Sequence, residues 1–186
     1  MKGIKVVIGL LFLIAIGPYY IYSQADEQEL KLVFIERFTQ FIDWNSNQLS
    51  DIEDVSKEFV IGTTGDSEYA EILHSFFSGR KLKGKPVKII TAQNKEDYLK
   101  CNLLHVSDMD DKKLNTLVET VSRLPILTIS DREEYSESGI QITICRQGEH
   151  LGFCINETAL AGSGLKANYL LLESARIINP VLKERP

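Results

Sequence analysis

The sequence is poor in the residues from which most enzyme centres are built. Its 186 residues include three cysteines, three histidines and one tryptophan. Basic residues are also in the minority, since 21 lysines and arginines face 26 aspartates and glutamates, giving a net charge of −5. This acidic balance argues against nucleic-acid phosphates or anionic lipid head groups as partners, because both need a basic surface. No repeat, low-complexity tract or Pro/Gly-rich linker divides the chain, and its length suits one domain with a full core.

Two segments resemble catalytic or nucleotide-binding motifs but lack their essential residues. Residues 62–66 lie between a predicted strand and a predicted helix, yet the Lys-Ser/Thr pair of a phosphate-binding loop is missing. We interpret them as a turn in which Asp66 or Ser67 caps the helix. Ser130 and Asp131 end another strand, where α/β proteins often place ligand-binding groups. They lack the glycines of a nucleophile elbow, so a cap of the following turn is the simpler interpretation.

The histidines are not arranged as metal ligands. His74, His105 and His150 fall on three different predicted elements, and none is spaced with another ligand on its own element. The acidic stretch 108–111 lacks the glycine and the distal glutamate of a calcium loop. We therefore predict no metal, no cofactor and no catalytic residue, hence a protein that is not an enzyme. Glu149 and His150 remain tentative candidates for a partner-binding or pH-sensitive contact.

The N-terminus has the features of an export signal. Residues 1–5 are basic, residues 6–16 are almost entirely apolar, and Ser23-Gln24-Ala25 is a small-x-small cleavage pattern. We predict a signal peptide at residues 1–25 and a mature periplasmic chain at residues 26–186. The alternative is an uncleaved anchor, because the apolar stretch is near the lower limit for a membrane span. No second long apolar run follows, so the mature domain is not expected to span a membrane.

A β-hairpin is predicted at residues 140–155. Isoleucines alternate on its first arm, and Leu151, Phe153 and Ile155 alternate on its second, around a polar turn that contains glycine. Cys145 and Cys154 are out of phase with this apolar set. Both should therefore point to the same, opposite face of the hairpin.

The three cysteines of an exported chain amount to one pair and one residue left over. Cys145 and Cys154 are the pair we favour for a disulfide. Direct opposition of the two residues requires a wide loop or a bulge around Gly148, because a tight turn at residues 147–148 would separate them. Cys101 precedes an apolar run; it is either a small buried hydrophobic residue or a free thiol with a redox or intermolecular role.

Apolar periodicity along the rest of the chain predicts strands that alternate with helices. Several strands are nearly continuous apolar runs, which is typical of a parallel sheet covered on both faces. We predict an α/β fold: a three-layer sandwich with a mixed, largely parallel sheet, an antiparallel hairpin near the C-terminus and a C-terminal helix. The predicted strands are 59–66, 85–91, 103–106 and 125–129, and the predicted helices are 27–44, 68–77, 110–123 and 165–178, with a helical turn at 95–100.

Trp44 ends the first predicted helix, which carries apolar residues at i, i+3 and i+4 spacing. Together with Phe38 and Phe41, it fits a core position better than a platform for a ligand, although both interpretations stay open.

An ordered series of segments, from about Leu30 to Ile178, resembles the YfiR family of periplasmic signalling proteins. Each segment is weak evidence by itself, and the order makes the resemblance specific. The segments are 34–44, similar to a first helix that ends in tryptophan; 59–66, similar to a first strand and turn; the cysteine-led strand 101–107; 125–131; the two hairpin arms 139–144 and 151–156; and 164–166 with 170–172, similar to the last helix.

The resemblance implies a non-enzymatic periplasmic regulator of signalling. It implies binding to the periplasmic part of an inner-membrane diguanylate cyclase, which is thereby repressed, and so control of cyclic di-GMP and biofilm formation. A membrane histidine kinase is the alternative partner that the family suggests, and a homodimer is also compatible. The resemblance carries a ligand contact over to Trp44 and a hairpin disulfide to Cys145 and Cys154.

The chain also departs from the family pattern. The earlier cysteine that would pair with the residue at Cys101 is missing, and Trp44 is followed by Asn45 in place of proline. Two further hypotheses rest on the residues themselves. One is a periplasmic module that binds small cell-envelope molecules through Trp44 and the loops at Gly65 and Ser130. The other is an envelope hydrolase acting through Ser130 or Asp131.

Overall fold

The computed structural model describes residues 27–44, 57–148 and 150–178. The chain divides into two compact units, residues 1–34 and residues 35–186. In the first unit the described residues are helical, and Lys31 Nζ lies 3.3 Å from Glu27 Oε1 one turn earlier. The helix extends to residue 41 at the start of the second unit. Within the described ranges, no helix has both the length and the apolar character needed to cross a membrane.

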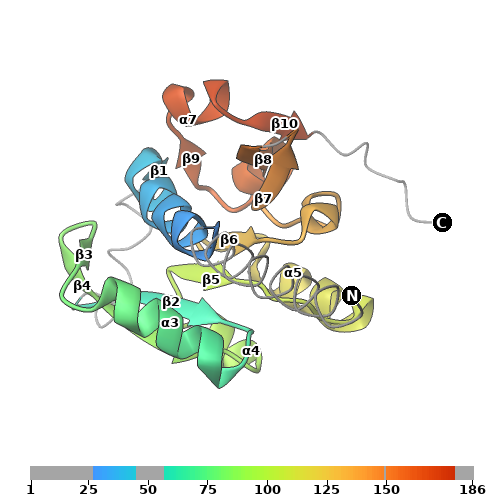
Figure 1. Cartoon of the computed structure of the whole chain (residues 1–186). Helices are drawn as coiled ribbons and strands as arrows, with labels where there is room; N and C mark the ends of the chain where they lie inside the picture. Colours follow the sequence, from blue (N-terminus) through green and yellow to red (C-terminus); the bar gives the residue numbers. More distant parts are fainter. Residues whose placement is uncertain (1–26, 45–56, 149, 179–186) are drawn as a thin grey trace, which may run out of the picture. The chain divides into compact units, whose positions relative to one another are not determined.

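The second unit is an α/β structure in which helices and strands alternate along most of the chain (Figure 1). Its helices are α3 (Ser67–Phe77), α4 (Lys95–Tyr98), α5 (Asp111–Val121), the 3-10 helix η1 (Glu133–Ser136), α6 (Glu157–Gly162) and α7 (Tyr169–Glu173). Its strands are β1 (Ile42–Asp43), β2 (Phe59–Thr63), β3 (Lys81–Leu82), β4 (Lys85–Thr91), β5 (Leu103–His105), β6 (Leu127–Ser130), β7 (Ile142–Gln147), β8 (His150–Asn156), β9 (Lys166–Ala167) and β10 (Arg176–Ile178).

The main sheet has the strand order β10-β8-β7-β6-β5-β2-β4-β3. Adjacent strands of this sheet are parallel except in the two hairpins, β3–β4 and β7–β8. A separate antiparallel pair joins β1 to β9. The predicted α/β fold with a mixed, largely parallel sheet is confirmed. Because β2 lies between β4 and β5, the strand order reverses at β2, which is the topological switch point of doubly wound sheets.

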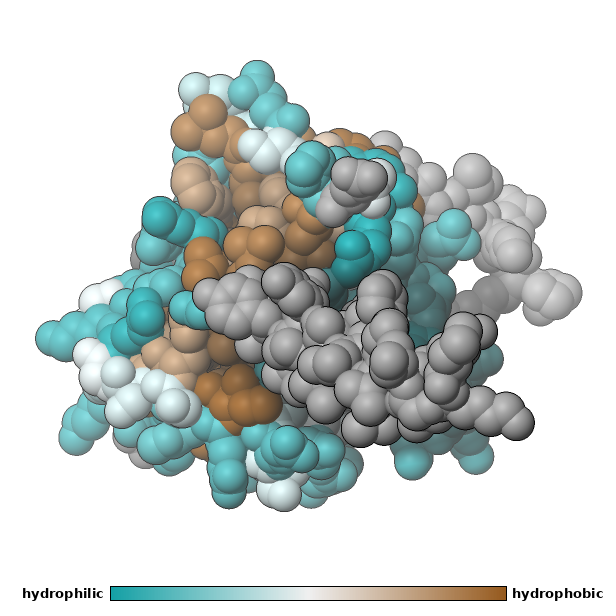
Figure 2. All heavy atoms as spheres, viewed as in Figure 1, coloured by the Kyte–Doolittle hydropathy of each residue, from teal (hydrophilic) through white to brown (hydrophobic). Residues whose placement is uncertain are grey.

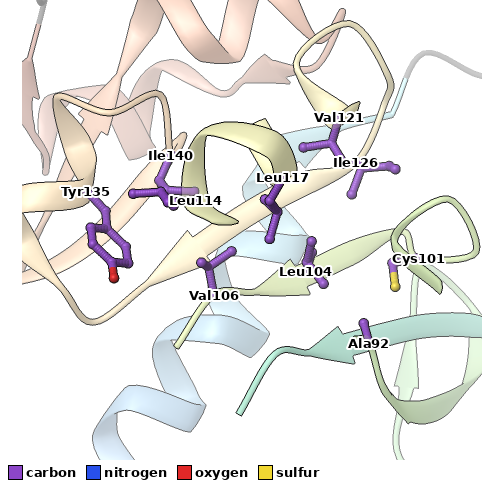
Figure 3. Close-up of a cluster of buried hydrophobic side chains, with 10 residues drawn as sticks. All are labelled: Ala92, Cys101, Leu104, Val106, Leu114, Leu117, Val121, Ile126, Tyr135 and Ile140. Carbon is purple, nitrogen blue, oxygen red and sulfur yellow. The ribbon is translucent and has the colours of Figure 1, made fainter. Parts of the chain in front are cut away.

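Helices lie against both faces of the sheet. On one face, Phe38 of the first helix packs edge-on against Phe153 of β8, with ring centroids 4.9 Å apart. On the other face, α5 inserts Leu114, Leu117 and Val121 into a cluster that also contains Leu104 of β5. Figure 3 shows this cluster, in which the sulfur of Cys101 points toward Ala92. The central strands of the sheet are thus buried from both sides, as their continuous apolar runs predict.

Polar side chains fix the starts of the helices. Asp66 Oδ1 accepts a hydrogen bond from Tyr69 N at 2.9 Å, and Asp110 Oδ1 accepts one from Lys113 N at 2.9 Å. Asn94 caps the short α4 in the same way. These bonds satisfy amide groups that have no partner within the helix. The choice between Asp66 and Ser67 is thereby settled in favour of Asp66.

The hairpin has the predicted faces but a different register. Ile142 pairs with Ile155 and Ile144 with Phe153, so the apolar set shares one face. However, Gln147 pairs with His150, so the two strands come together closer to the turn than expected, and Gly148 has a φ of +66°. The prediction of a wide loop or a bulge around Gly148 is therefore wrong. Glycine adopts this left-handed conformation without steric cost, which allows the short connection.

The C-terminal helix is shorter than predicted. The sequence pattern indicates a helix over 165–178, whereas α7 covers five residues. Asn168 Oδ1 accepts a hydrogen bond from Leu170 N at 3.0 Å and starts the helix there. Residues Arg176–Ile178 pair instead with β8 as a parallel strand, Arg176 opposite Cys154. The free edge of β8 offers backbone hydrogen bonds that outweigh the weak helical preference of this segment.

Candidate functional site

The paired thiols are the most distinctive chemical feature of the hairpin. Cys145 lies opposite Gly152 and Cys154 lies opposite Thr143, so the two cysteines are diagonal neighbours on one face, as the alternation predicts. Their Sγ atoms are 2.9 Å apart, and neither is bonded in the structure. Both side chains are buried. The diagonal placement brings the sulfurs together without the direct opposition that we expected.

An ion pair lies beside the two sulfurs. Register with β8 places Arg176 next to Cys154, and its guanidinium hydrogen bonds to the thiol of Cys154 and to the carboxylate of Glu133 in η1. The pKa of the Cys145 thiol is raised to about 12, mainly by burial and then by the hydrogen bond from the neighbouring Cys154, while the charge of Arg176 opposes the rise. The Cys145 thiol therefore stays protonated at neutral pH, with Cys154 and an arginine beside it.

These residues also test the prediction that the chain holds no metal. The side-chain ligand atoms of Glu133, Cys145 and Cys154 lie within 4.8 Å of one another, which is the spacing of a candidate metal centre. Arg176, however, already supplies the positive charge beside the carboxylate and one sulfur. A cation placed there would have to displace it. The group is thus better described as a thiol pair with a charged cover.

A second polar group lies at the carboxyl ends of the central strands, where the sequence singled out Gly65 and Ser130. Thr63 Oγ1 accepts a hydrogen bond from Gly65 N at 3.0 Å and lies 3.4 Å from His105 Nδ1. Tyr69 stacks on the His105 ring, with centroids 4.5 Å apart, and its hydroxyl oxygen lies 3.2 Å from His105 Nε2. Burial, and secondarily the charge of Asp131, raises the Tyr69 pKa.

The loops at these strand ends are filled by their own side chains. Ser130 Oγ donates to Val106 O at 2.6 Å and accepts from Arg132 N at 3.1 Å, which matches the interpretation of Ser130 as a turn cap. A side chain at Gly65 would begin 2.8 Å from Ser107 Oγ. The switch point therefore presents a packed hydrogen-bonded network, and Ser130 is engaged in structural bonds.

Trp44 lies in the interior. Its side chain is 7% exposed, its ring meets Phe59 edge-on at 5.6 Å, and Lys83 Nζ lies 5.5 Å from the ring centroid. Its indole nitrogen has no hydrogen-bond partner in the described part of the chain. Burial lowers the pKa of Lys83, and the charge of Asp43 counteracts this effect. The core position is therefore confirmed, while a ligand contact at Trp44 stays a prediction.

The remaining candidates are dispersed. Cys101 is buried, and its Sγ donates to Asp97 O at 3.2 Å. Burial and the charge of Asp97 raise its pKa to about 12. His150 is exposed at the hairpin turn, and residue 149 lies outside the described residues. The structure thus brings Cys145 next to Cys154, and Trp44 and Cys101 lie elsewhere.

Sequence reasoning missed Glu133, Arg176 and the Tyr69–His105 pair. Glu133 and Arg176 belong to a charged turn and to a segment predicted as helix, and no spacing signal links them to the cysteines. Parallel strands with a histidine near one carboxyl end could have pointed to His105, because neighbouring strand ends meet at one sheet edge.

Comparison with known proteins gives a match to a protein family. A family model described as YfiR/HmsC-like matches residues 28–176. No curated protein sequence matches the chain. The matched region contains all the strands and helices described above except residue 27 of the first helix and the last two residues of β10.

Proposed function

The chain belongs to the YfiR/HmsC-like family, and from that premise we propose that it represses a membrane-bound diguanylate cyclase by binding its periplasmic sensor part. The family consists of periplasmic regulators of signalling that are not catalysts. The observation that carries the proposal is the length of the match, residues 28–176, which covers most of the described fold. Release of the cyclase would raise cyclic di-GMP and promote biofilm formation.

The proposal includes export to the periplasm. Residues 1–25 would act as a cleaved signal peptide, and residues 26–186 would form the single mature domain. The thiol pair supports this location, because sulfurs 2.9 Å apart are positioned to form a disulfide in an oxidising compartment. We propose the bond Cys145–Cys154 as a structural clamp of the hairpin. Cys101, with no second cysteine beside it, would stay a thiol.

The surface around α7 is the best candidate for contact with the cyclase. Tyr169 is 66% exposed, Leu170 is 46% exposed, and Ile177 of β10 is 38% exposed. Figure 2 shows apolar atoms gathered over the region where Figure 1 places α7 and β9. Large apolar side chains left open to water favour a protein partner, because burying them releases free energy in proportion to their area.

A charge placed on this surface should break repression. In a strain that lacks the gene, the chain carrying Leu170→Asp should fail to lower cyclic di-GMP and should no longer co-purify with the membrane partner. Leu99→Asp is the matched control, because Leu99 is a leucine of similar exposure, 48%, on a different surface. Both variants should keep the thermal melting curve of the original chain.

Three outcomes would contradict parts of the proposal. Unchanged cyclic di-GMP after loss of the gene would exclude the cyclase as target. A sensor kinase in the co-purified fraction would replace the cyclase by the alternative partner. Equal repression by Leu170→Asp and Leu99→Asp would contradict the assignment of the surface around α7 as the contact with the cyclase.

A further inference from the structure

The described residues leave the sheet face that carries Gly62 incompletely covered where β2 and β4 begin. Val60 pairs with Lys88 and Gly62 with Ile90, so these four residues share that face. The helix next to them, α4, has only four residues. Val60 and Ile90 remain half-buried, and Leu99, which follows α4, is 48% exposed. A cavity of about 340 Å³ opens there, with these three apolar side chains in its lining.

The charged residues around this cavity are mostly positive. Within residues 57–148, three lysines line it, Lys57, Lys88 and Lys100, together with one acidic residue, Glu58. Lys88 Nζ lies 3.4 Å from Glu58 Oε2, and the side chains of this pair are 54% and 47% exposed. Lys100 Nζ likewise lies 3.0 Å from Asp97 Oδ1. Pairs of this kind at the surface contribute little free energy, so both lysines can turn to another anion at small cost. A lysine-rich rim stands out on a chain whose net charge is −5.

From this geometry we propose that the cavity binds a small amphipathic anion, namely a carboxylate or phosphate carried on an apolar body. The volume lies at the lower end of the range for small-molecule sites. The apolar body would cover Val60, Ile90 and Leu99, and the anionic head would take hydrogen bonds from the ammonium groups of Lys88 and Lys100. The site is separate from the proposed partner surface, since β4 and β10 lie toward opposite ends of the sheet order.

Decanoate below its micelle concentration is a suitable probe, with decyltrimethylammonium as a ligand of equal chain length and opposite charge. Titration followed by two-dimensional NMR should show saturable shifts of the Val60, Ile90 and Leu99 amides with decanoate. The cationic probe should give none. The double variant Lys88→Met/Lys100→Met keeps the apolar stems and removes both charges, and should weaken decanoate binding about tenfold.

Matched controls separate the site from general charge and fold effects. Lys112→Met/Lys113→Met removes two exposed lysines of α5 and should leave the affinity unchanged. Leu99→Asp should abolish binding, whereas Leu170→Asp should not. Equal binding of both probes, or equal loss in both lysine variants, would overturn the proposal.

Such an anion could be a free small molecule or the head group of a lipid surface, and vesicle binding distinguishes these two sources. Vesicles containing phosphatidylglycerol should not sediment the protein if the ligand is a free small molecule. Sedimentation that is lost in Lys88→Met/Lys100→Met, without any decanoate shift, would refute the cavity and indicate a lipid surface. Failure of this site leaves the proposed repression untouched, because its test uses the surface around α7.

Discussion

Two cysteine environments in this fold differ in what lies next to the sulfur. Cys101 is enclosed by the core between the sheet and α5, where it meets Gly62 and the backbone carbonyl of Asp97. Cys145 meets a second sulfur, and Arg176 covers the pair. Burial raises the pKa of both Cys101 and Cys145 to about 12. Burial therefore does not distinguish the core thiol Cys101 from the pair-forming thiol Cys145. The atoms next to each sulfur distinguish them.

The largest expected effect comes from breaking the hairpin clamp. If Cys145 and Cys154 are joined, dithiothreitol should lower the free energy of unfolding of the oxidised protein by about 2.7 kcal/mol, because the chain-entropy model gives this value for a ring of this size. Urea unfolding with and without reductant measures the change. Cys145→Ala/Cys154→Ala should abolish the response, and Cys101→Ala should retain it. A response that disappears in Cys101→Ala would instead assign the bond to Cys101.

Filling the space beside Cys101 should have the next largest effect. A methyl group at Gly62 would lie 2.4 Å from Cys101 Sγ and 3.0 Å from Leu104 Cδ1. Gly62→Ala should therefore cost about 2 kcal/mol of unfolding free energy through overpacking. Adding Cys101→Ala should restore much of this loss, because it removes the clashing sulfur. Strictly additive costs in this double-mutant cycle would contradict the contact.

The smallest expected effect is a loss of folding stability at alkaline pH that is caused by the Cys101 thiol. Its pKa rises from 9.0 to about 12 on folding, so the folded state holds the proton more tightly than the unfolded state. The contribution of this thiol to the free energy of unfolding is fully present below pH 9 and is lost as pH rises from 9 to 12. At pH 10 the loss should be about 1.4 kcal/mol relative to neutral pH.

Urea unfolding of the oxidised protein at pH 7.5 and pH 10 measures this loss. Cys101→Ala should reduce it by that amount, whereas Cys145→Ala/Cys154→Ala should not, because a bonded pair does not titrate. An equal loss in Cys101→Ala would show that other groups, such as Tyr69, dominate.

Local patterns predicted the elements and the faces of the sheet well. Alternation at 140–155 placed the isoleucines on one side of the hairpin and both cysteines on the other, as the register confirms. The register itself was not predicted, because it depends on the turn, and the left-handed Gly148 permits a shorter connection than the cysteine positions suggested. Apolar residues after 165 fit a helix and an edge strand equally well, and the free edge of β8 decided between them.

The surroundings of the candidate sites could not be predicted from spacing. Glu133 and Arg176 are 43 residues apart and meet only because η1 and β10 both approach the hairpin. The lysine-rimmed cavity likewise combines residues from β2, β4 and the end of α4. The charged residues of both groups look like ordinary surface charges in the sequence, and their roles arise from the topology of the sheet.

The central position of β2 has a consequence for how the chain acquires its structure. Both strands that flank it, β4 and β5, follow within residues 85–105, and β6 is next in line. Contacts between segments close in sequence form quickly. As the chain folds, the middle of the sheet can therefore assemble before the hairpin joins it. Oxidation of Cys145 and Cys154 would then be a finishing step, so a protein made under reducing conditions should be weakened at its last-formed end and still reach its native topology.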